Sequence, residues 1–252
     1  MSREYLNALW ELTKRELRRK YARSYLGILW SVFYPLARMA LVVFLFTHIF
    51  SKPIDRYPAY YFTGYLLYEF FYVAVYTSVT TLRDNKNLII KSKLPREMFI
   101  LSRVNTAFIN FGLGCIPYVG VLLFYKAQPS LISFLVVFDV FFLWLFVSGV
   151  AYLVSILYVF VRDTKNIVQH LLSILRFFVA MFYAKEWVAP GVQKFIEYNP
   201  PYVFIKVARD MVIYGVMPEL AYLLKMIIYG ISFFVIGKFI FNKCKDNVLV
   251  RL

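Results

Sequence analysis

Six long apolar stretches, separated by short polar segments, follow one another along the chain. About 20 consecutive apolar residues form a helix long enough to cross the hydrocarbon core of a bilayer, where only internally paired backbone is stable. The pattern therefore predicts an all-α membrane protein with six transmembrane helices. The fourth stretch is longer than a perpendicular crossing needs, so it must tilt or emerge on one side. The expected spans are residues 29–50, 60–82, 98–124, 131–161, 167–188 and 220–241.

The composition agrees with a membrane protein, and the charge pattern gives its orientation. Hydrophobic residues make up 61% of the chain, more than a soluble domain of 252 residues could bury. Of the 29 lysines and arginines, 19 fall on one side of the predicted topology and seven on the other. Because basic loops stay in the cytoplasm, both termini are expected there. The net charge of +15 lies beside the spans, where it suits anionic headgroups and requires no nucleic-acid partner.

A basic amphipathic segment precedes the first span. Between residues 3 and 23, apolar side chains recur with helical spacing on one face, and basic side chains occupy the other. Residues 1–28 are therefore expected to form an interface helix that lies along the membrane surface. Two roles stay open, a simple topology anchor or a docking surface for a cytoplasmic partner. The side chains that would serve either role are Trp10, Arg15, Arg18, Arg19 and Tyr21.

Three sets of residues resemble a known family, the ABC-2 type polysaccharide export permeases, over essentially the whole chain. Lys20-Tyr21-Ala22-Arg23-Ser24, followed by Leu26-Gly27, Leu29-Trp30 and Pro35, resembles the family's entry to its first span. Asn87-Leu88-Ile89, Lys91 and Leu94-Pro95 resemble its cytoplasmic loop, although the family often has Phe where Leu94 stands. Asn199-Pro200 followed by Arg209 resembles its external segment before the last span. The chain closely resembles the Wzm-type O-antigen permeases.

The resemblance implies a transport subunit of the bacterial inner membrane that exports lipid-linked polysaccharide, with O-antigen as the expected cargo. It also implies a homodimer and two separate ABC ATPase subunits, which would hold ATP and Mg²⁺. The sequence fits this division, because a phosphate-binding Gly-x-x-x-x-Gly-Lys-Ser/Thr loop is absent. The single Gly237-Lys238 pair is followed by Phe239. We expect no catalytic residue, cofactor or metal site in this chain.

The loop of residues 84–97 is the candidate ATPase-coupling segment. It places apolar residues in an otherwise charged cytoplasmic stretch, where they could insert into a groove of a partner. The alternative is that this segment dips into the lipid headgroups. The expected coupling residues are Asn87, Leu88, Ile89, Ile90, Lys91, Leu94 and Pro95.

Four ionisable residues are predicted near mid-membrane, where an unpaired charge is costly. Matched depths predict that Arg38 pairs with Glu69 and that Asp139 pairs with Arg176. Arg38 and Arg176 could instead face the transport path, where they would attract the pyrophosphate of a lipid-linked glycan.

The chain contains 26 Phe, 21 Tyr and 4 Trp, more than an interfacial belt requires. Flat rings with hydroxyls would suit a sliding sugar chain, although most of these residues are expected to face lipid or the protein interior. Because the family lines its channel with the first and fifth spans, the expected channel residues are Tyr34, Arg38, Arg176, Phe177, Phe178, Phe182 and Tyr183.

Residues 188–218 are too apolar for an ordinary external loop and contain several Pro and Gly. They are expected to form two short helices, near 192–197 and 202–214, that re-enter the outer leaflet. A periplasmic gate containing Asn199, Pro200 and Arg209 is the functional interpretation, and a passive cap is the alternative.

Other functions stay open at this point. The cargo of an ABC-2 exporter could be teichoic acid, capsule, a drug or a lipid. An ion-driven carrier or channel would need no ATPase, but two central carboxylates are little material for a proton relay.

Overall fold

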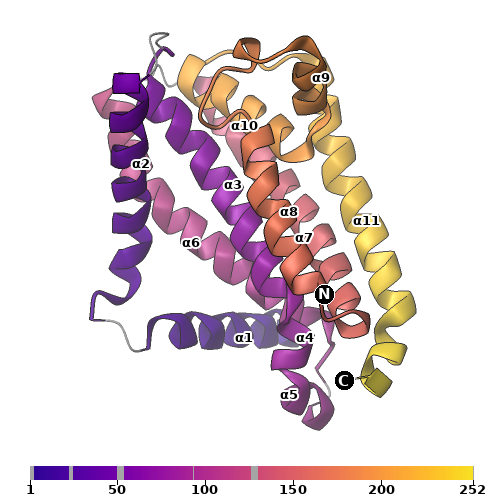
Figure 1. The fold of residues 1–252 in the computed structure, drawn as a ribbon. Helices are drawn as coiled ribbons and strands as arrows, with labels where there is room; N and C mark the ends of the chain where they lie inside the picture. Colours follow the sequence, from indigo (N-terminus) through magenta and orange to yellow (C-terminus); the bar gives the residue numbers. More distant parts are fainter. Residues whose placement is uncertain (1–2, 23–24, 50–53, 93, 126–129, 252) are drawn as a thin grey trace.

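The computed structural model describes residues 3–22, 25–49, 54–92, 94–125 and 130–251, with side chains placed as far as residue 245 except at residue 49. These residues form helices and turns and no strand. Figure 1 shows a bundle in which α3 (Tyr57–Val79) runs between its neighbours, with α2 (Trp30–Ile49) on one side and α1 (Arg3–Tyr21) across one end. The prediction of an all-α fold is confirmed.

Four helical segments in the described part of the chain are long and apolar enough to cross a membrane. They match the first, third, fourth and sixth predicted spans, which are confirmed as helices. The first includes a 3₁₀ turn at Gly27–Leu29 that leads into α2, and the fourth joins a similar turn, Leu131–Leu135, to α7 (Val136–Phe160). The others are α6 (Glu97–Phe124) and α11 (Leu220–Arg251).

The second predicted span also forms a helix, α3, but it lies in the interior of the bundle. Most of its residues are buried, including large side chains such as Tyr61, Phe62 and Tyr68. Its 23 residues span about 34 Å, but with many tyrosines and Glu69 it is not among the four segments that qualify as spans by length and composition.

The fifth predicted span, residues 167–188, is wrong as a continuous helix. Helix α8 (Thr164–Leu175) is followed by a 3₁₀ turn at Arg176–Phe178, and the helix does not resume. Ala180 has a φ of 45°, in the left-handed region that few residues other than glycine adopt. The chain therefore leaves the helical path at this point and continues as an irregular segment to the 3₁₀ turn Lys185–Trp187.

Two short helices cover the end of the bundle opposite α1 (Figure 1). They are α9 (Pro190–Tyr198) and α10 (Pro200–Arg209), the latter extended by a π-helical turn, Asp210–Tyr214. Each begins with a proline at the first helical position, where the missing N–H has no intrahelical partner to lose. The two predicted helices of the 188–218 segment are confirmed.

Glycines allow α7 and α11 to approach each other closely. A Cβ added at Gly149 would lie 2.2 Å from the carbonyl oxygen of Phe233, and one added at Gly237 would lie 2.3 Å from that of Gly149. Small residues at a crossing point bring two backbones into contact, which is a common way to pack helices in membranes. The Gly237-Lys238 pair thus has a packing role in α11.

The opposite end of the molecule gathers α1, α4 (Thr81–Asp84), α5 (Lys86–Lys91) and the last turns of α7 and α11 (Figure 1). The predicted N-terminal helix is confirmed over Arg3–Tyr21. Most of the basic residues that predicted the cytoplasmic side belong to these elements.

Candidate functional site

The predicted coupling loop contains a short helix, α5, that projects from the α1 end of the bundle (Figure 1). Ile89 is buried and anchors this helix, whereas 58% of Ile90 is exposed. The projecting surface therefore presents one large apolar side chain among polar ones. Asn87, Lys91 and Pro95 are exposed as well, and Leu88 and Leu94 are half-buried.

A buried carboxylate, Glu16, ties this surface to α1 and α6. Only 3% of Glu16 is exposed. Its two oxygens lie 2.7 Å from the Arg15 guanidinium and 2.9 Å from that of Arg103 on α6. Arg103 also lies 3.5 Å from Asp84 at the end of α4, and Arg15 donates a hydrogen bond to the side-chain oxygen of Asn85. We call this set of five residues the Glu16 network.

The first turn of α1 makes a second contact with the bundle. The Tyr5 hydroxyl donates a 2.9 Å hydrogen bond to Glu97 at the start of α6. Burial and the neighbouring Glu97 carboxylate raise the pKa of Tyr5, so the hydroxyl stays a donor throughout the physiological range. Glu97 also lies 3.8 Å from the ammonium of Lys238 on α11. Helices α1, α6 and α11 thus meet at Glu97.

The predicted interface-helix residues divide between the surface and the interior. Trp10, Arg18 and Arg19 are exposed, and Arg15 belongs to the Glu16 network. The Tyr21 hydroxyl hydrogen-bonds with the side chains of Ser31 and Asn110, which fixes the end of α1 against α2 and α6. Arg23 and Ser24, which belong to the motif that begins at Lys20, lie outside the described residues.

A cavity of about 370 Å³ lies between the end of α1 and helices α2, α3 and α6. Lys20, Tyr21 and Asn110 line one part of it, and Tyr34, Tyr65 and Glu69 line another. Its walls combine aromatic rings with hydroxyl, amide and charged groups. Of the predicted channel residues, Tyr34 lines this cavity.

The predicted pairing of the central charges is wrong. Glu69 lies 3.5 Å from Arg176, because α8 ends beside α3 and releases Arg176 toward it. The Arg38 guanidinium lies over the rings of Tyr34 and Tyr65 instead, at 5.4 and 6.0 Å, in a cation–π arrangement. Arg176 similarly lies over Tyr72 and Tyr68, at 5.1 and 5.6 Å.

Asp139 is fully buried, and neither of its carboxyl oxygens has a hydrogen-bond partner among the described residues. The predicted partner, Arg176, is engaged by Glu69.

The predicted channel aromatics occupy the break after α8. Phe182 packs against Phe46 of α2 and Tyr61 of α3, with ring centroids 5.9 and 5.7 Å apart. Phe178 packs against Phe195 of α9, with centroids 5.3 Å apart. Phe177 is 63% exposed, and the Tyr183 hydroxyl donates to its carbonyl. These side chains join α2, α3 and α9 around the irregular segment.

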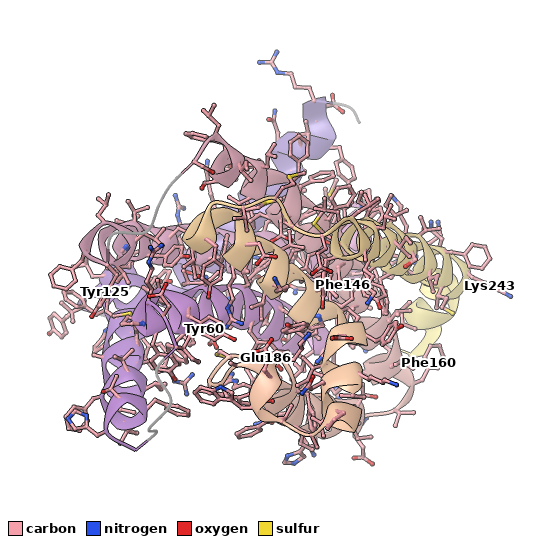
Figure 2. The ribbon with its side chains drawn as sticks, turned by 90° about the horizontal axis from the view of Figure 1, so that it is seen from above. Tyr60, Tyr125, Phe146, Phe160, Glu186 and Lys243 are labelled. Carbon is pink, nitrogen blue, oxygen red and sulfur yellow. The ribbon has the colours of Figure 1, made fainter. Side chains whose placement is uncertain are left out.

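Hydrogen bonds from α3 and α10 satisfy the carbonyls that the broken helix leaves unpaired. The Tyr60 hydroxyl donates to the carbonyls of Ala180 and Tyr183, at 3.2 and 3.0 Å. Tyr57 donates to the carbonyl of Phe182 at 3.0 Å. A buried carbonyl without a donor is costly, so these donors stabilise the break. Figure 2 looks down on this end of the molecule, where Tyr60 and Glu186 are labelled.

The predicted gate residues lie at the same break. Arg209 is 2% exposed and lies 3.4 Å above the ring centroid of Tyr60. It donates to the carbonyls of Tyr60 and Ala180, at 3.2 and 3.0 Å. The Asn199 side chain donates to the carbonyl of Phe178 at 2.8 Å, and Pro200 begins α10. Asn199 and Arg209 thus both donate hydrogen bonds to the irregular segment after α8.

Comparisons with known proteins give one consistent result. No family model matches the chain. Two O-antigen export system permease proteins RfbA from Klebsiella pneumoniae are 29% and 27% identical over 240 residues, which is 93% of this chain and 90% of each relative. The protein of the same name from Myxococcus xanthus is 29% identical over 181 residues, which is 71% of this chain and 69% of the relative.

The resemblance to polysaccharide export permeases is confirmed. The described residues that carry this resemblance lie at both ends of the molecule. Those of the motifs near Tyr21 and Leu88 lie at the α1 end, and Asn199, Pro200 and Arg209 lie at the other.

Sequence reasoning missed several residues of this permease-like chain. Glu16 and Arg103 carried no motif, although Glu16 is an acidic residue within a basic run, a pattern that indicates local pairing. Tyr60 is one of many aromatic residues in its span, and nothing in the sequence distinguishes it from the others.

Proposed function

We propose that this chain is the membrane-spanning permease subunit of an ATP-driven exporter, and that it moves lipid-linked O-antigen across the bacterial inner membrane. The observation that carries this proposal is the similarity, over 93% of the chain, to permeases named for O-antigen export. The chain is not an enzyme in this proposal, and its partner ATPases hydrolyse ATP.

The proposed topology has six crossings with both termini in the cytoplasm. Helix α3 crosses inside the bundle, and α8 enters the membrane and stops at the break. The irregular segment with α9 and α10 then forms a re-entrant cap in the outer leaflet. The gathering of basic residues on α1, α5 and the end of α11 supports this orientation.

The proposed partners are a second copy of the chain and two ATPase subunits. Helix α5 is the proposed contact with the ATPase, since it projects from the bundle and exposes Ile90. Through the Glu16 network, a displacement of α5 would be transmitted to α1 and α6 by contacts of 2.7 to 3.5 Å.

The proposed cargo path runs past Tyr34, Arg38 and Arg176 toward the aromatic residues of the break. Arg38 is held by aromatic rings and Arg176 by one carboxylate, so both guanidiniums keep donors available for a pyrophosphate group. The cap built around Arg209 is the proposed periplasmic gate.

A deletion experiment tests the proposal. Cells without this chain should lose surface O-antigen and accumulate the lipid-linked glycan inside. Cells in which the partner ATPase carries an inactivated phosphate-binding loop should show the same defect. Normal surface glycan in the ATPase mutant, with loss only on removal of this chain, would instead indicate an ion-driven carrier.

A further inference from the structure

A second polar hollow, of about 520 Å³, lies at the α1 end between the start of α6 and the last turns of α11. Leu94, Arg96 and Glu97 line one side of it, and Lys238, Phe241 and Lys245 line the other. It is separate from the cavity between α1, α2, α3 and α6, with which it shares no lining residue.

We propose that this hollow binds the phosphate of an anionic phospholipid in the cytoplasmic leaflet. Its lining combines three cations, Arg96, Lys238 and Lys245, with a single carboxylate, Glu97. Glu97 is already engaged by Tyr5 and Lys238, so the hollow keeps an excess of positive charge. Clustered cations repel one another, and a phosphate would offset that repulsion while accepting hydrogen bonds from both lysine and arginine.

The depth of the hollow fits a headgroup. Helix α1 lies across the end of the bundle, as expected for a helix in the plane of the membrane surface (Figure 1). The 2.9 Å hydrogen bond from Tyr5 to Glu97 places the hollow at the level of α1. Basic pockets at this depth between transmembrane helices are typical sites for anionic lipid headgroups.

The surface next to the hollow fits acyl chains. Val235, Ile236 and Phe239 of α11 are 57%, 51% and 66% exposed, and each lies within one helical turn of Lys238 along the chain. A lipid whose phosphate contacts Lys238 could therefore lay its chains along this apolar surface. This combination favours a phospholipid over a soluble phosphate compound.

The test is lipid binding by the full-length chain reconstituted in phosphatidylcholine nanodiscs and titrated with phosphatidylglycerol. Replacing both lysines, Lys238→Gln with Lys245→Gln, should weaken phosphatidylglycerol binding about 30-fold, since each basic residue near a membrane surface contributes several-fold. Lys243→Gln is the matched control, because it removes the same charge from α11 outside the hollow, and it should bind like the wild type. In Figure 2 the Lys243 side chain lies at the outer edge of the molecule.

Three results would overturn the proposal: equal binding by the double variant and the control, equal binding of phosphatidylcholine, or displacement of the lipid by millimolar glycerol phosphate. Normal lipid binding with loss of a co-purifying ATPase would assign the hollow to a protein partner instead. If the double variant does not fold, Lys245→Gln alone takes its place. The proposal rests on the orientation proposed above, but lipid binding needs neither cargo nor ATPase, so its failure is distinguishable from failure of export.

Discussion

Arg209 is stabilised without a carboxylate partner among the residues that the structure describes. Its charge faces the ring of Tyr60 at 3.4 Å, and two of its nitrogens donate to backbone carbonyls. The same Tyr60 supplies a hydroxyl to the carbonyls of Ala180 and Tyr183. One tyrosine therefore supports both the cation and the broken helix that the cation holds.

Removing the Tyr60 hydroxyl should therefore weaken the cap. Tyr60→Phe keeps the ring under Arg209 but removes the donor to the Tyr183 carbonyl and leaves the Ala180 carbonyl to Arg209, and a lost bond to a buried group costs about 1–3 kcal/mol. We expect a lower unfolding temperature of the purified protein. Tyr125→Phe, at the outer edge of the molecule in Figure 2, should leave it unchanged. Equal unfolding temperatures of the two variants would show that the hydrogen bonds from Tyr60 to the break do not stabilise the protein.

The two central carboxyl groups should respond differently to neutralisation. Glu69→Gln removes the charge that faces Arg176 at 3.5 Å and leaves that guanidinium without its carboxylate, so it should destabilise the protein. Asp139→Asn replaces a buried group whose oxygens lack partners among the described residues, so it should change the free energy of unfolding by less than about 1 kcal/mol. Thermal unfolding of the two variants side by side measures this. A larger loss for Asp139→Asn would indicate a function for that carboxyl group.

At the scale of elements, apolar patterning predicted the helices but not the break after α8. Residues 167–188 contain no proline or glycine to mark a helix end, so they read as one span. The partners that permit the break, Tyr57 and Tyr60, lie more than 100 residues earlier in the chain. By contrast, α9 and α10 were predictable, because Pro190 and Pro200 mark their starts locally. Asn199 and Arg209 were likewise recognised from a local sequence motif. The carbonyls that they contact could not be predicted, because these contacts depend on the fold.

The crossing of α7 and α11 should depend on its glycines. Gly149→Ala would place a Cβ 2.2 Å from the backbone oxygen of Phe233, where the helices must separate. We expect a loss of about 1–3 kcal/mol, typical of overpacking, seen as a lower unfolding temperature. Gly112→Ala in α6 is the control: its Cβ would meet nothing within 4 Å, and alanine favours a helix by about 0.5–1 kcal/mol over glycine. A stable Gly149→Ala protein would contradict this close packing.

At the scale of the whole molecule, the Glu16 network connects the projecting α5 helix to the membrane bundle through polar contacts. Glu16 contacts Arg15 on its own helix and Arg103 on α6, and those arginines in turn contact Asn85 and Asp84 beside α5. A force applied to α5 would therefore reach α1 and α6 together. Helix α1 also borders the cavity that Tyr34 and Glu69 line, so its displacement would alter the shape of that cavity.

Neutralising Glu16 should uncouple export from ATP hydrolysis. With Glu16→Gln, Arg103 and Arg15 lose the carboxylate that joins them, so α1 and α6 no longer follow a displacement of α5 as one unit. We expect the ATPase complex to assemble and hydrolyse ATP while surface glycan falls at least tenfold. Glu11→Gln is the matched control, since Glu11 lies on the exposed side of α1 and pairs only locally, with Lys14 at 2.8 Å. Because Arg103 is linked to α1 through Glu16, Arg103→Gln added to Glu16→Gln should reduce export little further. Two results would contradict this role: independent effects of the two substitutions on export, or a fall in ATP hydrolysis parallel to the fall in export. Either would show that the network only stabilises the protein and does not transmit movement from α5 to the membrane helices.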